Sequence, residues 1–304
     1  MATTVWCHAK SAGTGHRGNG YLGSAVVEAL LTAGHQVVAL VHGDRSRVPD
    51  GAVVRSADLL DPQALSAAVR DVDAVCHLAA LTRVRESAAA RAQYAVINVD
   101  GTGNLLDAMR AAGIRGLVFA STVAVYGTPD RQPMPEDLPE DPGHPYAETK
   151  LAAERLIESR TATGDLAASV LRLCNIAGGP DPDPTRILPR ILAATPEHPL
   201  RVNGDGSVIR DYLHIADAAA AFAAAVVRLP DPGGFRRYNI GSGVGTTLNG
   251  LIAAAERITG RAIPVDYGPP VDEPPCLISD STRANYELAW RPRYSTIDAI
   301  IRGA

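Results

Sequence analysis

The sequence predicts an α/β protein with a doubly wound parallel sheet and a smaller C-terminal α/β lobe. Over the first 180 residues, short apolar β-rich runs alternate with helical stretches. Continuous apolar strands between helices are typical of a parallel sheet that helices cover on both faces. Beyond Gly178 the segments become shorter and are linked by loops, the first of which is rich in proline and aspartate. These later segments are expected to form the smaller lobe, laid over the strand ends.

The alternation can be followed along the chain. The predicted strands are 35–41, 74–78, 116–121 and 168–173. The predicted helices are 25–33, 62–70, 98–112, 147–158, 216–228 and 248–259. Asp61 is a plausible N-cap and Gly113 a natural C-cap of two of these helices.

Composition excludes several classes of protein. With 304 residues and 46% hydrophobic residues, the chain can bury a full core. The net charge of −4 argues against nucleic acid or an anionic membrane surface as the main partner. No apolar run approaches the roughly 20 residues that span a bilayer, and the N-terminus lacks the apolar stretch of a signal peptide. The four cysteines are scattered without metal-site spacing, so we expect no metal and a reducing cytoplasm.

A tyrosine and a lysine four residues apart are the most informative pair. The chain has 29 basic residues, of which only Lys10 and Lys150 are lysines, and Lys150 stands in Pro145-Tyr146-Ala147-Glu148-Thr149-Lys150. Residues four apart share a helix face, so phenol and ammonium could meet. A nearby cation would lower the tyrosine pKa from about 10, which gives a general acid–base for a hydroxyl. The alternative is a surface tyrosine and a solvated lysine.

A glycine-rich segment precedes the first predicted helix, in Gly18-Asn19-Gly20-Tyr21-Leu22-Gly23-Ser24. Such glycines allow a tight turn with a phosphate at the helix N-terminus, which indicates a dinucleotide site. A strand should run straight into this kind of loop. Here residues 10–17 make a poor strand, and Arg17 occupies the place of the first glycine. The alternative is a flexible glycine-rich N-terminus.

A compensated frameshift would explain why no strand precedes the loop. If GC-rich codons for residues 11–20 are read with one base moved, they can encode Ala-Leu-Val-Thr-Gly-Gly-Thr-Gly, a strand followed by a glycine loop. A coding sequence that cannot yield this reading in another frame would remove the hypothesis. If the residues are genuine, we expect poor affinity for the cofactor.

The end of the second strand bears on cofactor choice. A carboxylate there usually accepts the adenosine ribose hydroxyls and selects NAD. Val41 and His42 stand at this place, and Arg45 or Arg47 could hold a 2′-phosphate, which favours NADP. The arginines could instead be solvated loop charges, and Asp44 could serve NAD.

Further motifs stand in a fixed order along the chain. They are Asp58-Leu59, His77-Leu78-Ala79-Ala80, Asn98-Val99-Asp100-Gly101-Thr102, Ser121-Thr122 with Tyr126-Gly127, and Arg210-Asp211-Tyr212-Leu213-His214. Together with the glycine loop and the Tyr146–Lys150 pair, they resemble the extended short-chain dehydrogenase/reductase family, in its NAD-dependent epimerase/dehydratase branch of nucleotide-sugar enzymes. The resemblance runs from about Gly18 to Pro292 and implies a Rossmann-type sheet.

The resemblance implies a role for each motif. Tyr146 would be the acid–base, Lys150 would hold the nicotinamide ribose, and Thr122 would hydrogen-bond the reacting sugar hydroxyl. The implied cofactor-binding residues are Gly18, Gly20, Tyr21, Leu22, Gly23, Arg45, Asp58, Leu59, Ala79, Ala80, Asn98, Tyr146 and Lys150. The implied substrate-binding residues are Thr122, Asn175 and Arg210. Alternatively, Arg210 forms a structural ion pair with Asp211, and Asn175 caps a helix or turn.

The resemblance also implies the partners and the domain limits. We expect NAD(P) as cofactor, a nucleotide-diphosphate sugar as substrate, and a homodimer. Residues 1–174, with about 208–240 returning to them, would form the dinucleotide-binding domain. Residues 175–207 and 241–304 would form the substrate-binding lobe.

Three activities remain open at this stage. The first is epimerisation of a nucleotide-linked hexose at position 4, the second is NADPH-dependent reduction of a 4-keto-6-deoxyhexose, and the third is a non-catalytic dinucleotide-binding sensor. The run Val84 to Ser87 favours the epimerase. Pro270 stands where the branch usually has a phosphate-binding arginine, and this favours the reductase. Val123 and Ala124 replace the Asp-Glu pair of dehydratases, so water elimination is not expected.

Overall fold

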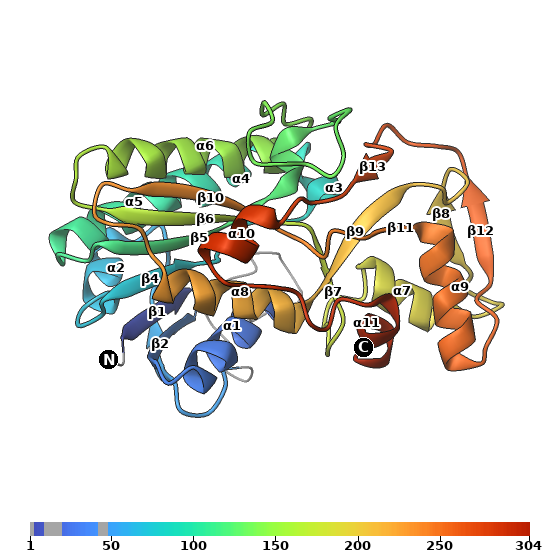
Figure 1. Ribbon diagram of the computed structural model, residues 1–304, viewed down its shortest axis with the longest axis horizontal. Helices are drawn as coiled ribbons and strands as arrows, with labels where there is room; N and C mark the ends of the chain where they lie inside the picture. Colours follow the sequence, from blue (N-terminus) through green and yellow to red (C-terminus); the bar gives the residue numbers. More distant parts are fainter. Residues whose placement is uncertain (1–2, 9–19, 42–47) are drawn as a thin grey trace.

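The computed structural model describes residues 3–8, 20–41 and 48–304 of the chain. A large parallel sheet with helices on both faces lies beside a smaller lobe (Figure 1). Gly18, the segment proposed to be frameshifted up to residue 19, and the loop that carries Arg45 and Arg47 lie outside the described residues.

The large sheet contains seven strands in the order β10-β6-β5-β4-β1-β2-β3, and every neighbouring pair is parallel. Their bounds are β1 Thr4–His8, β2 Gln36–Val41, β3 Val53–Ser56, β4 Ala74–His77, β5 Gly116–Thr122, β6 Ala167–Leu173 and β10 Phe235–Ile240. The order changes direction between β1 and β4, and in such sheets ligands bind at this switch point, beyond the carboxyl ends of the strands. The predicted Rossmann-type doubly wound sheet is confirmed.

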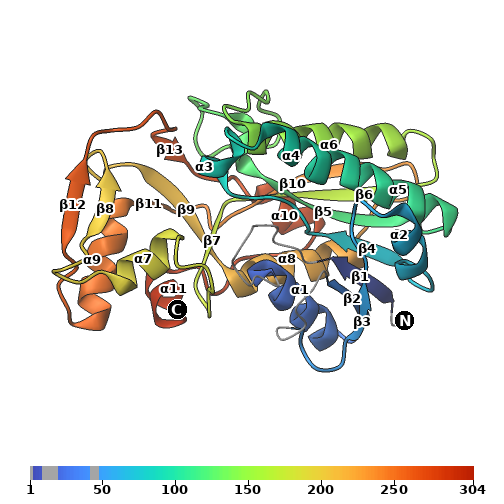
Figure 2. The same ribbon diagram turned by 180° about the vertical axis from the view of Figure 1, so that it is seen from behind.

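Helices cover the two faces of this sheet (Figure 2). On one face lie α1 (Tyr21–Thr32) and α8 (Ile215–Val227), whose apolar residues share one core with the strands. On the other face lie α2 (Pro62–Ala68), α5 (Gly101–Ala111) and α6 (Pro145–Thr161), which enclose a second core. The short helices α3 (Val84–Ser87) and α4 (Arg91–Ala95) lead into α5 through a π-turn, η1 (Val96–Asp100).

The smaller lobe has its own core and two small sheets. One sheet joins β7 (Asn175–Ala177), β9 (Ile209–His214), β11 (Gly245–Thr247) and β13 (Cys276–Leu277), and the other pairs β8 (Leu200–Asn203) with β12 (Val265–Gly268). The helices are α7 (Ile187–Ala193), α9 (Leu248–Thr259) and α11 (Ile297–Arg302), and α10 (Thr282–Glu287) packs against β10 of the large sheet. β9 pairs within the lobe, and the chain then continues into α8, which packs against the large sheet.

The structure corrects the sequence analysis at the first strand. A strand does precede the glycine loop: β1 pairs in parallel with both β2 and β4, in the interior of the sheet. It lies upstream of residues 10–17, where a strand had been sought. The premise of the frameshift hypothesis, that no strand precedes the glycine loop, was therefore wrong. The strand was missed because Thr4 and His8 leave only three apolar residues between them, and its neighbours supply its hydrogen bonds and packing.

Two further observations concern cysteines and membranes. Cys76 and Cys174 are buried thiols, as expected. No group of three His, Cys, Asp or Glu residues in the described part of the chain could hold a metal ion. None of the helices within that part is both long and apolar enough to cross a bilayer.

Candidate active site

Tyr146, the predicted acid–base, lies in the first turn of α6. Pro145 occupies the first helical position, and the Nδ1 atom of His144 accepts a hydrogen bond from the Ala147 N–H at 3.2 Å. This side chain therefore caps the helix, which satisfies one of its free N–H groups. The His144 ring also stacks on the Tyr146 ring, with centroids 5.9 Å apart and planes 6° apart. Capping and stacking together fix the direction of the phenol.

Burial raises the pKa of Tyr146 to about 12, although hydrogen bonding by Thr122 and the charge of Arg186 act in the opposite direction. The expectation that Lys150 lowers the tyrosine pKa is wrong for the ligand-free protein. In the interior, loss of solvent disfavours the phenolate by more than these two groups stabilise it.

Lys150 is only 2% exposed, and its Nζ atom lies 4.0 Å from the centroid of the Phe119 ring on β5. No hydrogen bond within the described structure joins it to Tyr146. Burial lowers the pKa of Lys150 to about 7, against the opposing charge of Glu154. Because this pKa is close to neutral pH, the charge of Lys150 depends on the groups around it.

Thr122 is the last residue of β5, so it lies at the carboxyl edge of the sheet. Its backbone is extended, and its Oγ1 atom accepts a hydrogen bond at 3.2 Å from the Ala124 N–H, which starts the turn η2 (Val123–Tyr126). The same hydroxyl is a hydrogen-bond partner of the Tyr146 phenol. The two side chains that the sequence assigned to the reacting hydroxyl are therefore together.

The predicted cofactor residues follow strand ends along the same edge. Ala79 and Ala80 are buried just after β4, and Leu59 is buried after β3, where its side chain packs against Gly101. The Oδ1 atom of Asp58 accepts a hydrogen bond from the Leu60 N–H at 2.9 Å. The two alanines add little side-chain bulk at the end of β4, where the resemblance places the dinucleotide.

The start of α1 continues this edge. Gly20 is the N-cap, and the first turn carries no acidic residue, so the helix presents free N–H groups and its positive dipole end. Gly23 is buried and Leu22 is half-buried. The Tyr21 hydroxyl donates a hydrogen bond to the Gly178 carbonyl of the lobe. This helix end can therefore hold the pyrophosphate of a dinucleotide.

Asn98 lies in η1 and has all its side-chain groups engaged within the protein. Its Oδ1 atom accepts from the Leu81 N–H at 2.8 Å, while its Nδ2 atom donates to the Leu81 carbonyl at 3.1 Å and to Thr149 Oγ1 at 3.0 Å. It thereby ties the segment after β4 to the catalytic helix. This geometry gives Asn98 a positioning role beside the predicted cofactor site.

The predicted substrate residues lie in the lobe. Arg210, on β9, is 11% exposed, and its Nη2 atom lies 2.6 Å from Glu273 Oε2. Asp211 instead accepts the N–H groups of Ser242 and Gly243 at 2.8 and 3.0 Å, so the alternative of an Arg210–Asp211 ion pair is not what the structure shows. Asn175 is exposed at the start of β7.

Pro270 lies close to Gly204, beside a cleft of about 610 Å³ that Asp205, Tyr267 and Gly268 also line. A proline offers no charge to a phosphate. The place at which the family usually has an arginine is therefore apolar here.

Arg186 is a candidate functional residue that the sequence analysis missed. It is the N-cap residue of α7, and its guanidinium lies 4.9 Å from the Tyr21 ring centroid and 3.6 Å from Asp181 Oδ2. Its charge also acts on the Tyr146 phenol. The only sequence signal was an arginine after the proline–aspartate loop, and nothing in that pattern places the loop beside Tyr21.

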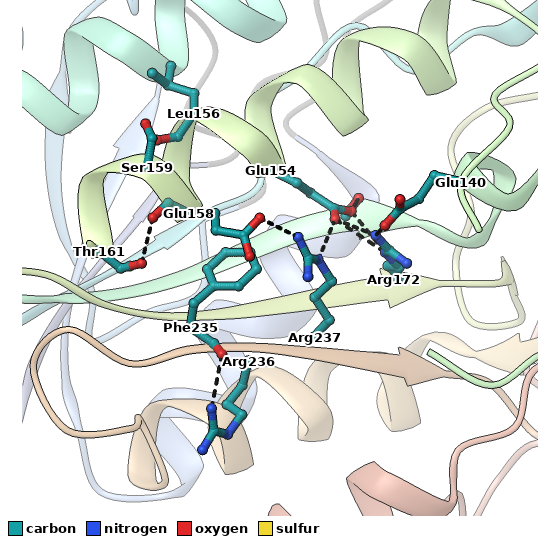
Figure 3. A network of polar contacts seen from close by, with 11 residues as sticks. Glu140, Glu154, Leu156, Glu158, Ser159, Thr161, Arg172, Phe235, Arg236 and Arg237 are labelled. Carbon is teal, nitrogen blue, oxygen red and sulfur yellow. Dashed lines mark hydrogen bonds and ion pairs between the residues drawn. The ribbon is translucent and has the colours of Figure 1, made fainter. Parts of the chain in front are cut away.

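A buried ion-pair network supports the catalytic helix from below (Figure 3). Arg172 on β6 and Glu154 on α6 are both 0% exposed, and their side chains meet at 2.7 Å. Arg172 also reaches Glu140 at 2.8 Å, while Arg237 on β10 joins Glu154 at 3.4 Å and Glu158 at 2.6 Å. The guanidinium of Arg172 lies 4.8 Å from the Tyr126 ring centroid. The network ties α6 to β6 and β10.

This arrangement defines a class of protein. The sheet provides a dinucleotide edge at its switch point, and a half-buried tyrosine with a hydroxyl partner lies at the end of β5. This is the arrangement of a dinucleotide-dependent oxidoreductase that acts on a carbinol. The sequence pattern of the NAD dependent epimerase/dehydratase family matches residues 14–241. The chain belongs to this family.

Individual relatives agree with this assignment. A UDP-glucose 4-epimerase from Lacticaseibacillus casei is 36% identical over 94% of this chain and 93% of that protein. The crystal structure of UDP-glucose 4-epimerase from Brucella ovis in complex with NAD has a TM-score of 0.91 at 32% identity, and the match covers 100% of this chain and 97% of that one. A Stenotrophomonas maltophila UDP-glucose-4-epimerase with NAD and formylated UDP-arabinopyranose has a TM-score of 0.88 at 31% identity, covering 99% and 96%.

These comparisons confirm the family, the fold class and the nucleotide-sugar epimerase expected from the sequence, and they do not favour the ketoreductase or the sensor. They support a cofactor of the NAD type and a nucleotide sugar as ligand. The preference for NADP is not confirmed. Arg45 and Arg47, on which it rested, lie outside the described residues.

Proposed function

We propose that this protein is an NAD-dependent epimerase that inverts the hexose carbinol at position 4 of a nucleotide-diphosphate sugar. The observation that carries the proposal is the pairing of Thr122 with Tyr146 at the carboxyl end of β5, facing the edge on which α1 begins. Support comes from the relatives, which share this chain's sequence over nearly its whole length.

In the proposed mechanism, Thr122 and Tyr146 bind the sugar hydroxyl at position 4, and Tyr146 removes its proton. When bound, NAD would take the hydride from the carbinol carbon and give it back to the opposite face of the ketone, and its positive charge would favour the phenolate; the start of α1 and the small residues after β4 fit such a dinucleotide. Tyr146 then returns the proton after the 4-keto sugar has turned in the pocket. Because burial raises the tyrosine pKa, the phenol works as a base only when hydrogen bonds and cations stabilise its phenolate.

We assign the substrate diphosphate to Arg210 and Arg186. Arg210 is held by Glu273, so a diphosphate would have to displace or share this partner. Arg186 lies against the Tyr21 ring and its charge acts on the Tyr146 phenol, so it can supply the charge that Pro270 does not. Asn175, exposed on β7, is placed to bind the sugar–diphosphate portion.

We further propose NAD rather than NADP, since the related structures hold NAD. The residues proposed to hold NAD are the predicted cofactor-binding residues that the structure describes, from Gly20 and Tyr21 at the start of α1 to Tyr146 and Lys150 on α6. A homodimer formed through α5 and α6 is also proposed. Sedimentation velocity on the purified protein tests this assembly, and a monomer at micromolar concentration would contradict it.

The test is interconversion of UDP-glucose and UDP-galactose without added NADPH. We expect turnover that Tyr146→Phe reduces by more than a hundredfold while NAD binding is retained, because only the proton path is removed. Tyr286→Phe is the matched control, since the Tyr286 side chain is 81% exposed and has no proposed role in the site. Stoichiometric consumption of NADPH with a keto sugar would instead identify a ketoreductase. Dinucleotide binding without any rate that depends on Tyr146 would identify a sensor.

A further inference from the structure

Glu154 is a buried acid at the point where the catalytic helix crosses three strands. It lies one helical turn after Lys150 on α6 and is 0% exposed. Ser121 on β5, Arg172 on β6 and Arg237 on β10 all direct polar groups at its carboxylate. Figure 3 shows the two arginines converging on it from the sheet below.

The contacts account for both carboxylate oxygens. The Ser121 hydroxyl donates to Oε1, which also accepts from Arg172 Nε at 3.1 Å. Arg172 Nη2 donates to Oε2 at 2.7 Å, and Arg237 Nε approaches the same oxygen at 3.4 Å. Charge-assisted hydrogen bonds from two arginines therefore occupy both oxygens of this carboxylate.

A purely structural ion pair would leave other features unexplained. Arg172 Nη1 is buried without a hydrogen-bond partner, so the cluster is not arranged for maximum stability. Lys150 is buried nearby with its ammonium on the Phe119 ring, and the carboxylate that acts on its charge is Glu154. Ser121 directly precedes Thr122, the residue that meets the catalytic phenol. Glu154 is therefore connected to two members of the site at once.

We propose that Glu154 is a positioning residue that keeps Lys150 in its charged form and holds the end of β5 in place through Ser121. The effect of Glu154 on the charge of Lys150 does not depend on the proposed function, whereas its importance for turnover rests on that function. Arg172 and Arg237, which also face Glu154, carry positive charges that offset part of the carboxylate's effect on Lys150.

The charge of Lys150 matters because the ammonium, unlike the neutral amine, adds to the cations and hydrogen bonds that stabilise the Tyr146 phenolate in the proposed mechanism. Burial already lowers the pKa of Lys150 to about 7, so the lysine titrates near neutrality. Without the carboxylate the ammonium would lose its proton at a lower pH. Activity should then fall at a lower pH on the alkaline side of its profile.

The two lysines of the chain allow a direct measurement. In a Lys10→Arg background, protein grown with lysine labelled with ¹³C at Cε gives a single lysine signal, whose chemical shift against pH reports the pKa of Lys150. Glu154→Gln should lower this pKa by about 1. Arg237→Gln should raise it. Glu158→Gln is the matched control, since Glu158 contacts Arg237 from the exposed end of the network, and we expect a change below about 0.2.

The kinetic readout is kcat against pH for the same variants. We expect the alkaline midpoint to move with the lysine pKa in each variant, while KM for the nucleotide sugar stays within about twofold. A lysine pKa that Glu154→Gln leaves unchanged would overturn the proposal, even if stability or kcat falls. A shifted lysine pKa in a protein without epimerase activity would leave Glu154's role intact and refute only the proposed function.

Glu154→Gln leaves two arginines short of a partner and could fail to fold. Glu154→Asp and Arg237→Gln then test the proposal, because both variants retain a carboxylate at position 154. The first must keep the lysine pKa within about 0.5 of the wild-type value, and the second must raise it. A decrease in Arg237→Gln would contradict the proposed electrostatic coupling.

Discussion

Replacing Lys150 with methionine should stabilise the ligand-free protein and abolish turnover. Burial lowers the pKa of this lysine from 10.5 to about 7. Between these pH values the unfolded chain therefore binds a proton that the folded protein has released. The stability of the wild type consequently rises with pH across this window, and below it the folded protein bears the full cost of a buried charge.

The size of the effect follows from the same shift. At about 1.4 kcal/mol for each pH unit between the two pKa values, the cost at low pH has an upper limit of about 5 kcal/mol. Methionine has no charge to desolvate and keeps an apolar stem against Phe119. Because local relaxation and water reduce such limits in real proteins, we expect Lys150→Met to gain about 1–3 kcal/mol at pH 7.

Urea unfolding of NAD-free protein at pH 7 and pH 9.5 measures the difference, followed by tryptophan fluorescence. The gain of the variant should be largest at pH 7 and should shrink at pH 9.5, where the wild-type lysine is neutral in the folded state. A variant less stable than wild type at pH 7, or a gap independent of pH, would refute the reasoning.

Three further substitutions test other parts of the structure. Thr122→Val removes the hydroxyl that partners the catalytic phenol, so initial-rate assays should show kcat reduced about 10- to 100-fold, and an unchanged kcat would contradict this role. Glu273→Gln frees Arg210 from its 2.6 Å ion pair, so KM for the UDP-sugar should fall about three- to tenfold, whereas a rise would show that Glu273 aids binding. Asp217→Asn weakens three hydrogen bonds to residues 293–295, and urea unfolding should show a loss of about 2–3 kcal/mol, with no loss arguing against this anchor.

The central strands could be predicted because continuous apolar runs are typical of strands that are buried on both faces. β4, β5 and β6 are continuous apolar runs, and every residue in each of them is buried. β1 and β3 were missed for a physical reason. β1 is very short and takes its stability from partners distant in the sequence, while β3 lies at the sheet edge and is only partly buried.

The sequence named residues that the structure brings together, Thr122 and Tyr146, but it did not predict their electrostatics. Helical spacing brought Tyr146 and Lys150 to one helix, and the family pattern added Thr122. Spacing carries no information on desolvation, so it could not show that burial raises the pKa of the phenol. Arg186 and Glu154 were missed because their partners come from segments far away along the chain, and tertiary folding alone brings these together.

The strand order affects how the protein folds during its synthesis on the ribosome. The strand at one edge of the large sheet, β10, ends only at Ile240, and it delivers Arg237 to the cluster under the catalytic helix. At roughly 5–20 residues per second, synthesis takes on the order of tens of seconds to reach that point. Until then β6 exposes an unpaired edge, and nascent chains should depend on chaperones that shield it.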